Sequence, residues 1–130
     1  MQRCNILLIM TDQHRFDCLG CTGNPVIETP NLDWIASQGT VFRHAYTPSP
    51  SCVPARACLM TGMDPWKTGI LGMGRGQGPM GTGFSQTLPG ELSRYGYHTQ
   101  GIGKMHFSPQ RSLNGFHNTI LDESGRAEDP

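Results

Sequence analysis

Two segments of this chain that are predicted as buried strands, the first of them an apolar run, each end abruptly in polar residues. Cys4 to Met10 is followed by Thr11-Asp12-Gln13-His14, and His98 to Gly103 is followed by Lys104-Met105-His106. A continuous apolar run such as residues 4–10 predicts a strand buried on both faces, and residues 98–103 are predicted as a second buried strand. Because ligands bind beyond the carboxyl ends of strands in open parallel sheets, the two polar endings are candidate site residues.

Periodic spacing and end signals predict the elements between these strands. Thr29 to Gly39, Pro54 to Thr61 and Thr87 to Tyr95 each combine a helical pattern with a proline or cap at the start, and a glycine ends or follows each pattern. Thr40 to Tyr46 predicts a strand, and the proline-rich residues 47–51 predict a loop. The expected class is α/β, with a mostly parallel sheet flanked by helices that is incomplete in this chain.

Composition narrows the possible partners and compartment. Ten Lys plus Arg balance ten Asp plus Glu, so there is no basic surplus to favour nucleic acid. The strongest apolar run, Ile6 to Met10, is far too short to span a membrane or to direct export, so we expect a cytoplasmic protein with no membrane partner. An odd number of cysteines, five, argues against a disulfide framework.

Cys52 is predicted at the amino terminus of a helix, with Arg56 one turn further along. Unpaired N–H groups and a partial positive charge at this position favour an anion and a deprotonated thiol. Arg56 adds a fixed positive charge. Taken singly, the two residues fit a structural thiol and a surface ion-pair partner better, so the wider pattern decides between the two interpretations.

That pattern, Cys52-Val53-Pro54-Ala55-Arg56 running into Leu59-Met60-Thr61-Gly62, resembles the signature of the sulfatases, which belong to the alkaline phosphatase superfamily. Three further stretches are similar to the family in the same order, and the resemblance spans roughly residues 5 to 116: Asn5 to Gln13, Thr29 to Asp33 and Gly96 to His106. The resemblance implies an alkaline-phosphatase-like fold, with residues 1–130 as the amino-terminal segment of a sulfatase-like catalytic domain.

The resemblance also implies a reaction, the hydrolysis of sulfate esters. In the family the cysteine is oxidised to formylglycine, whose hydrate attacks sulfur and then releases sulfate. Carried over, Cys52 is the nucleophile precursor and a metal ligand, and Arg56 holds the hydrate. Lys104 and His106 contact the sulfate and the leaving oxygen.

The same resemblance implies a divalent metal cation bound by Asp12, Gln13 and the modified Cys52. Calcium is the expected ion, and magnesium, manganese and zinc are alternatives. Many relatives have two adjacent aspartates where this chain has Asp12-Gln13, so the second ligand here is either a neutral amide oxygen or missing.

The implied partners are a small-molecule sulfate ester and a formylglycine-generating maturation enzyme. The family takes further metal ligands from an Asp followed by Asn or His much later in the chain, and no such dipeptide occurs here. We therefore expect a fragment, a truncated product or one half of a split protein, completed by a carboxyl-terminal part or an oligomer partner. Two alternatives stay open: phosphonate or phosphate ester hydrolysis, and an inactive piece that needs a partner chain.

Other cysteines and charged residues carry weaker signals. Cys18 and Cys21 with His14 have the spacing of a partial zinc site, but two small packed thiols are the better interpretation. Arg15 and Asp17 predict a structural ion pair. Cys58 lies on a different helix face from Cys52 and is predicted to be core.

A glycine-rich stretch, residues 72–83, contains six glycines and predicts a flexible or ligand-covering loop rather than a phosphate-binding P-loop. Arg75 within this stretch is a candidate contact for an anionic substrate, although a solvated charge is the default interpretation.

Overall fold

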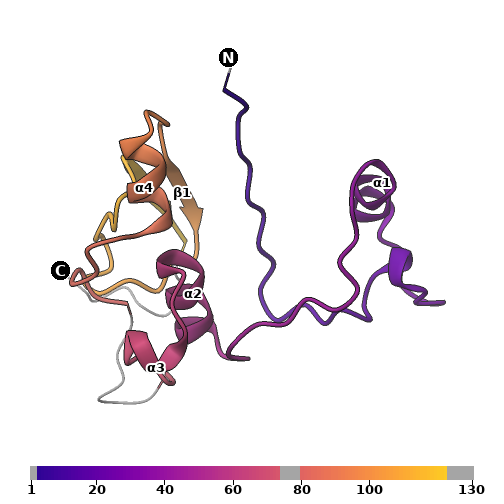
Figure 1. Cartoon of the computed structure of the whole chain (residues 1–130). Helices are drawn as coiled ribbons and strands as arrows, with labels where there is room; N and C mark the ends of the chain where they lie inside the picture. The colour runs from indigo at the N-terminus through magenta and orange to yellow at the C-terminus, as the bar shows by residue number, and fades with distance from the viewer. Residues whose placement is uncertain (1–2, 74–79, 123–130) are drawn as a thin grey trace. The chain divides into compact units, whose positions relative to one another are not determined.

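The computed structural model describes residues 3–73 and 80–122 (Figure 1). The chain divides into two compact units, one ending at Tyr46 and the other beginning at Thr47. Arg75 and the polar tail from Glu123 to Pro130 lie outside the described residues.

The first unit contains a short 3-10 helix, η1 (Gly20–Thr22), and the helix α1 (Pro30–Gln38). Pro30 is the first residue of α1 and Gly39 follows its last turn, so the helix predicted from these signals is confirmed. The Asp33 carboxylate accepts hydrogen bonds from the Cys21 backbone N–H at 2.7 Å and from the Thr29 hydroxyl at 2.9 Å. These bonds join η1 to α1.

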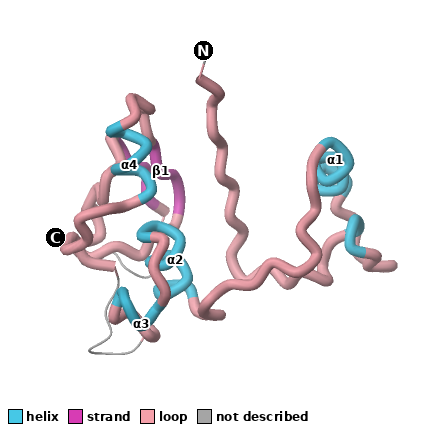
Figure 2. Tube along the Cα trace, in the orientation of Figure 1, coloured by secondary structure: helices cyan, strands magenta, loops and turns pink. Residues whose placement is uncertain are grey.

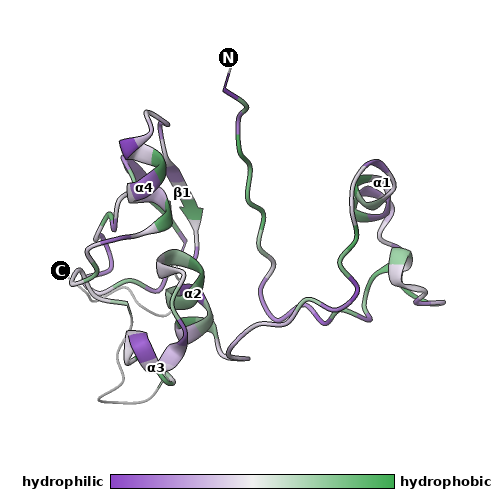
Figure 3. Ribbon diagram, in the orientation of Figure 1, coloured by the Kyte–Doolittle hydropathy of each residue, from purple (hydrophilic) through white to green (hydrophobic). Residues whose placement is uncertain are grey.

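The predictions of strands at 4–10 and 40–46 are wrong for this structure. Both segments are extended or irregular and solvent-exposed (Figure 2), and the first is strongly apolar along most of its length (Figure 3). Leu7, for example, is 83% exposed. A strand needs hydrogen bonds from a neighbouring strand, and no such neighbour pairs with either segment among the described residues.

The second unit begins with the helices α2 (Cys52–Thr61) and α3 (Pro65–Thr68), which pack against each other. Gly62 ends α2 in the left-handed conformation at φ 68°, and its N–H bonds to the Cys58 carbonyl. The third helix, α4 (Leu88–Arg94), begins after Thr87, whose hydroxyl caps the Gly90 N–H at 3.2 Å. The helices predicted at 54–61 and 87–95 are confirmed, whereas α3 was not predicted.

Two parallel strands, β1 (Gln100–Gly103) and β2 (Asn118–Leu121), pair in register from Gln100 with Asn118 to Gly103 with Leu121. The predicted strand at 98–103 is confirmed with shorter bounds. It is buried on one face only, because Gly101 is buried whereas Ile102 is exposed. The strand β2 was not predicted from the sequence. The parallel pair with its helices confirms the predicted α/β class.

The core of the second unit joins α2 to the segment after β1. Its largest fully buried side chains include Val53 on α2, Met80, and Phe107, which forms a parallel bridge with Met80. Cys58 is also buried, as predicted. This core fixes the amino-terminal half of α2 against residues 104–107.

None of the helices formed by the described residues is long and apolar enough to cross a lipid bilayer.

Candidate functional site

Cys52 is the first residue of α2, as the sequence predicts. Ser51 before it is extended, and its carbonyl accepts the first helical hydrogen bond from the Ala55 N–H at 3.0 Å. The prolines of the preceding loop disfavour helix before this point, which helps to set the start of α2. The Cys52 side chain is half-buried at the positive end of the helix.

The side chain of Lys104 contacts Cys52, although the two residues lie far apart in the sequence. Its ammonium donates to the Cys52 Sγ at 3.7 Å, across 52 residues of sequence. Lys104 follows directly after β1, so the end of this strand delivers a positive charge to the start of α2. Only the resemblance linked these two residues beforehand, because no local pattern reports a contact over this sequence distance.

Arg56 holds the same two segments together through the backbone. Its guanidinium Nη1 donates to the Lys104 carbonyl oxygen, and the residue is only 8% exposed. A buried guanidinium is costly unless it is hydrogen-bonded, so this contact fixes where Lys104 leaves the strand. The prediction that Arg56 is a surface ion-pair partner, weighed from the residue alone, is wrong.

His106 lies two residues beyond Lys104 and is buried next to the core residues Met105 and Phe107. Its backbone φ of 58° is in the left-handed region, which histidine adopts more readily than bulky or β-branched residues. The structure therefore brings both Cys52 and Arg56 into contact with Lys104 and places His106 in the adjoining buried turn.

The surroundings of Cys52 differ from those of Cys58 on the same helix. Burial raises the pKa of the Cys58 thiol, with a smaller contribution from the negative charge of Asp64, so Cys58 stays protonated and unreactive. Cys52 instead has the helix terminus and the Lys104 ammonium beside it. The helix terminus and Lys104 form a cationic corner around the half-exposed Cys52 side chain. Such a corner is suited to a tetrahedral anion.

The predicted metal ligands Asp12 and Gln13 belong to the first unit, whereas Cys52 belongs to the second. Both are exposed, and Gln13 has a left-handed φ of 47° in the turn after the apolar run. Within residues 3–73 and 80–122, no group of three or more His, Cys, Asp or Glu side chains is arranged to hold a metal ion.

Other candidates in the first unit have structural partners. The His14 Nε2 lies 2.9 Å from the Cys18 carbonyl oxygen, and Cys18 and Cys21 are half-buried free thiols. Arg15 and Asp17 form the predicted ion pair, although at an exposed position. Hydrogen bonding to Arg15 lowers the pKa of the Asp17 carboxyl below its usual range.

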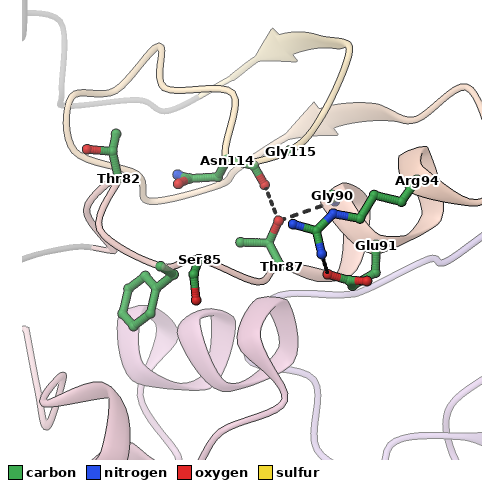
Figure 4. Close-up of a pocket in the computed structure, with 9 residues that line it drawn as sticks. Thr82, Ser85, Thr87, Gly90, Glu91, Arg94, Asn114 and Gly115 are labelled. Carbon is green, nitrogen blue, oxygen red and sulfur yellow. Dashed lines mark hydrogen bonds and ion pairs between the residues drawn. The ribbon is translucent and has the colours of Figure 1, made fainter.

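Sequence reasoning missed a polar cleft in the second unit, between the start of α4 and the loop at Asn114 (Figure 4). The available signal was the Asn114-Gly115 dipeptide, which marks a turn. Both residues adopt a left-handed φ, 44° and 95°.

Comparison with known proteins gives one consistent result. The sulfatase family profile matches residues 4–128. The chain is 50% identical over 119 residues to an arylsulfatase of Clostridium perfringens, a match that covers 92% of this chain and 24% of the relative. It is 36% identical over 105 residues to an N-acetylglucosamine-6-O-sulfatase of Bacteroides thetaiotaomicron, covering 81% of this chain and 18% of the relative.

A human relative extends the same similarity. The chain is 38% identical over 111 residues to a steryl-sulfatase of Homo sapiens, covering 80% of this chain and 19% of the relative. The chain thus spans about a quarter or less of the length of these relatives. The profile match over nearly all of its residues shows that the chain belongs to the sulfatase family.

Proposed function

We propose that this protein hydrolyses sulfate esters, with Cys52 converted to formylglycine as the nucleophile. The observation that carries the proposal is the Lys104 ammonium 3.7 Å from the Cys52 Sγ, at the first residue of α2. A sulfate ester is a tetrahedral anion, and two positive features converge on the residue that would attack it. The sulfur atom here stands where the formylglycine oxygens would be.

Each neighbour of Cys52 has a proposed task. Lys104 would bind a sulfate oxygen and stabilise the charge that develops on it. Arg56 has further N–H donors beyond the one given to the Lys104 carbonyl, and these would hold the formylglycine hydrate. His106 would contact the leaving oxygen, because an imidazole can donate a proton near neutral pH.

A divalent cation, with calcium the best fit, would be held by Asp12, Gln13 and the modified residue 52. A carboxylate beside an amide oxygen in an exposed turn is a donor set suited to a hard cation, which takes six to eight oxygen ligands in the case of calcium. Magnesium, manganese or zinc would need a different ligand number or geometry. When bound, the cation would polarise the sulfate and favour the ionised nucleophile.

We also propose that residues 1–130 form the amino-terminal segment of a sulfatase-like catalytic domain. The exposed apolar residues 4–10 support this, since they fit a strand that a neighbouring strand covers. A carboxyl-terminal part of the domain or an oligomer partner would supply that neighbour, and a formylglycine-generating enzyme would mature Cys52.

The direct test is release of sulfate and phenol from an aryl sulfate, using the intact protein made in a host that converts other sulfatases. Cys52→Ala should abolish turnover, because it removes the precursor of the nucleophile. Cys58→Ala, six residues further along the same helix, should retain activity as the matched control. Lys104→Met should lower kcat by about 10² to 10³, as does loss of one donor to a developing oxyanion.

Two results would change the proposed function. Faster cleavage of the matched aryl phosphate or phosphonate would make a phosphorus ester the substrate, since the same cationic corner fits either tetrahedral anion. Absence of turnover on all three esters, with Cys52 fully converted, would favour an inactive piece that requires a partner chain.

A further inference from the structure

Gly103 ends β1 in a backbone conformation that is not that of a strand. Its φ is 91°, whereas residues of parallel strands have a φ of about −120°. Gly103 stands directly before Lys104, whose ammonium contacts the Cys52 Sγ at 3.7 Å. Within residues 100–105 it is the one position with a left-handed φ. The turn out of β1 toward the candidate site therefore lies at Gly103.

The alternation of side chains along β1 stops at this turn. Gly101 is buried, and Ile102 is 70% exposed on the other face. If the strand continued, the side chain of residue 104 would lie on the exposed face with Ile102, because residues two apart share a face. Lys104 is instead half-buried and reaches Cys52, and Met105 after it is buried. The direction of the Lys104 side chain is therefore not that of a continuing strand.

Hydrogen bonds hold the backbone on both sides of the turn. The Gly103 carbonyl accepts from the Asp122 N–H at 3.3 Å, and Gly103 pairs with Leu121 of β2. One residue later, the Lys104 carbonyl accepts from the Arg56 guanidinium on α2. Figure 1 shows β1 running toward α2. The backbone is thus fixed to β2 before the turn and to α2 after it, and the left-handed φ of Gly103 joins the two directions.

Lack of space is not what requires a glycine at position 103. A Cβ built on Gly103 meets no atom within 4 Å, whereas one built on Gly101 would lie 2.9 Å from the Met105 Cε. Gly101 is therefore needed for packing. At Gly103 only the backbone disfavours a side chain, because the left-handed conformation of another residue is less populated by a factor of about 5 to 30.

We propose that Gly103 is a positioning residue for the cationic corner: its left-handed backbone turns Lys104 out of β1 and onto Cys52. A side chain at position 103 would relieve its strain by returning to an extended φ, which would turn Lys104 toward the face of Ile102. The ammonium would then leave the first residue of α2. The position of Lys104 does not depend on conversion of Cys52, whereas the effect of Gly103 on turnover rests on the proposed sulfate ester hydrolysis.

The test detects the proximity of the two side chains by chemical cross-linking. o-Phthalaldehyde joins a thiol and an amine that lie close together into a fluorescent isoindole, and peptide mass spectrometry identifies the linked residues. The intact chain, produced without the maturation system so that Cys52 is a thiol, should give a link between Cys52 and Lys104. Lys104→Met should abolish this link. Lys67, the other lysine of the chain, lies in a different tryptic peptide, so a link to it is recognised separately.

Gly103→Ala should lower the yield of this link by about fivefold or more, because the left-handed turn becomes less populated. Gly69→Ala is the matched control. Gly69 also lies in the second unit, has a φ of 72° and has open space around its Cβ, but it ends α3. Both variants should lose a similar amount of thermal stability, and only Gly103→Ala should lose the link. In the converted protein, Gly103→Ala should lower kcat on an aryl sulfate and Gly69→Ala should not.

Gly103→Asn should partly restore the link, with a yield roughly twofold below that of the parent, because asparagine adopts the left-handed conformation more readily than alanine. The proposal is overturned if Gly103→Ala loses stability but still links Cys52 to Lys104 as the parent does, which would make Gly103 a purely structural glycine. If Gly103→Ala does not fold, Gly103→Asn decides, and a yield equal to that of the parent would overturn the proposal. Expected link yields without turnover in any converted form would support the role of Gly103 and contradict the proposed function.

Discussion

The two units differ in how far their apolar side chains are buried. In the second unit, Val53, Met80 and Phe107 are almost fully buried and lock α2 against the residues after β1. In the first unit, α1 has no buried residue and the run at 6–10 is exposed. The contact between Cys52 and Lys104 therefore rests on a core that the second unit builds by itself, whereas the turn at Asp12 has no such support among the described residues.

The largest expected effect compares two phenylalanines. Phe107→Ala removes a ring that is 0% exposed and should destabilise the second unit by about 3 to 5 kcal/mol. Phe42→Ala removes a ring that is 73% exposed and should change stability by less than about 0.5 kcal/mol. Urea unfolding followed by circular dichroism measures both. Equal losses would show that the first unit has a core of its own.

Two glycines with nearly the same backbone sharpen the comparison. Gly115 in the second unit has φ 95° and Gly23 in the first has φ 97°. Gly115→Ala should cost about 2 to 5 kcal/mol, the sum of left-handed strain and a steric clash with Gly90. Gly23→Ala meets nothing within 4 Å and should cost only the strain, about 1 to 2 kcal/mol. A matching cost in thermal unfolding would contradict the tight packing of the second unit.

A third comparison concerns the buried guanidinium. Arg56→Gln should cost about 2 kcal/mol, because it removes the donor to the Lys104 carbonyl inside the core. It should also loosen Lys104, which would be seen as changed chemical shifts of residues 52 and 104 in NMR spectra. An unchanged unfolding curve together with unchanged spectra would mean that the contact does not hold the two segments.

The smallest effect is expected at the exposed pair Arg15 and Asp17. Arg15→Gln should raise the pKa of the Asp17 carboxyl toward its usual value, measured by NMR titration, with little change in stability. Because the pKa of Asp17 is lowered in the folded chain, the contribution of the pair is present above the unfolded pKa and is lost as pH falls through the folded pKa. An unshifted Asp17 titration in the variant would contradict this.

Helices were predictable from sequence, because their hydrogen bonds are local and their ends carry local signals. Gly62 and Thr87 marked the end of α2 and the start of α4 correctly. Strands were less predictable, because a strand also needs a neighbour. The apolar residues 4–10 had the pattern of a strand but have no paired neighbour among the described residues, whereas β2 (Asn118–Leu121) forms because β1 lies beside it.

The candidate site was predictable in part. The placement of Cys52 at a helix terminus followed from its proline-rich surroundings, but the approach of Lys104 spans 52 residues and came only from the family resemblance. Family membership and the parallel strand pair confirm the alkaline-phosphatase-like α/β class. The metal ligands Asp12 and Gln13 remain a prediction, because they lie in the other unit.

The central claim is that Cys52, and not Cys58, is the reactive cysteine of α2. Peptide mass spectrometry of the protein, produced with an active maturation system, tests it directly. Loss of about 18 Da at Cys52, with Cys58 an intact thiol, is the predicted result. An unmodified Cys52 in a host that converts other sulfatases would contradict the claim and remove the assigned nucleophile.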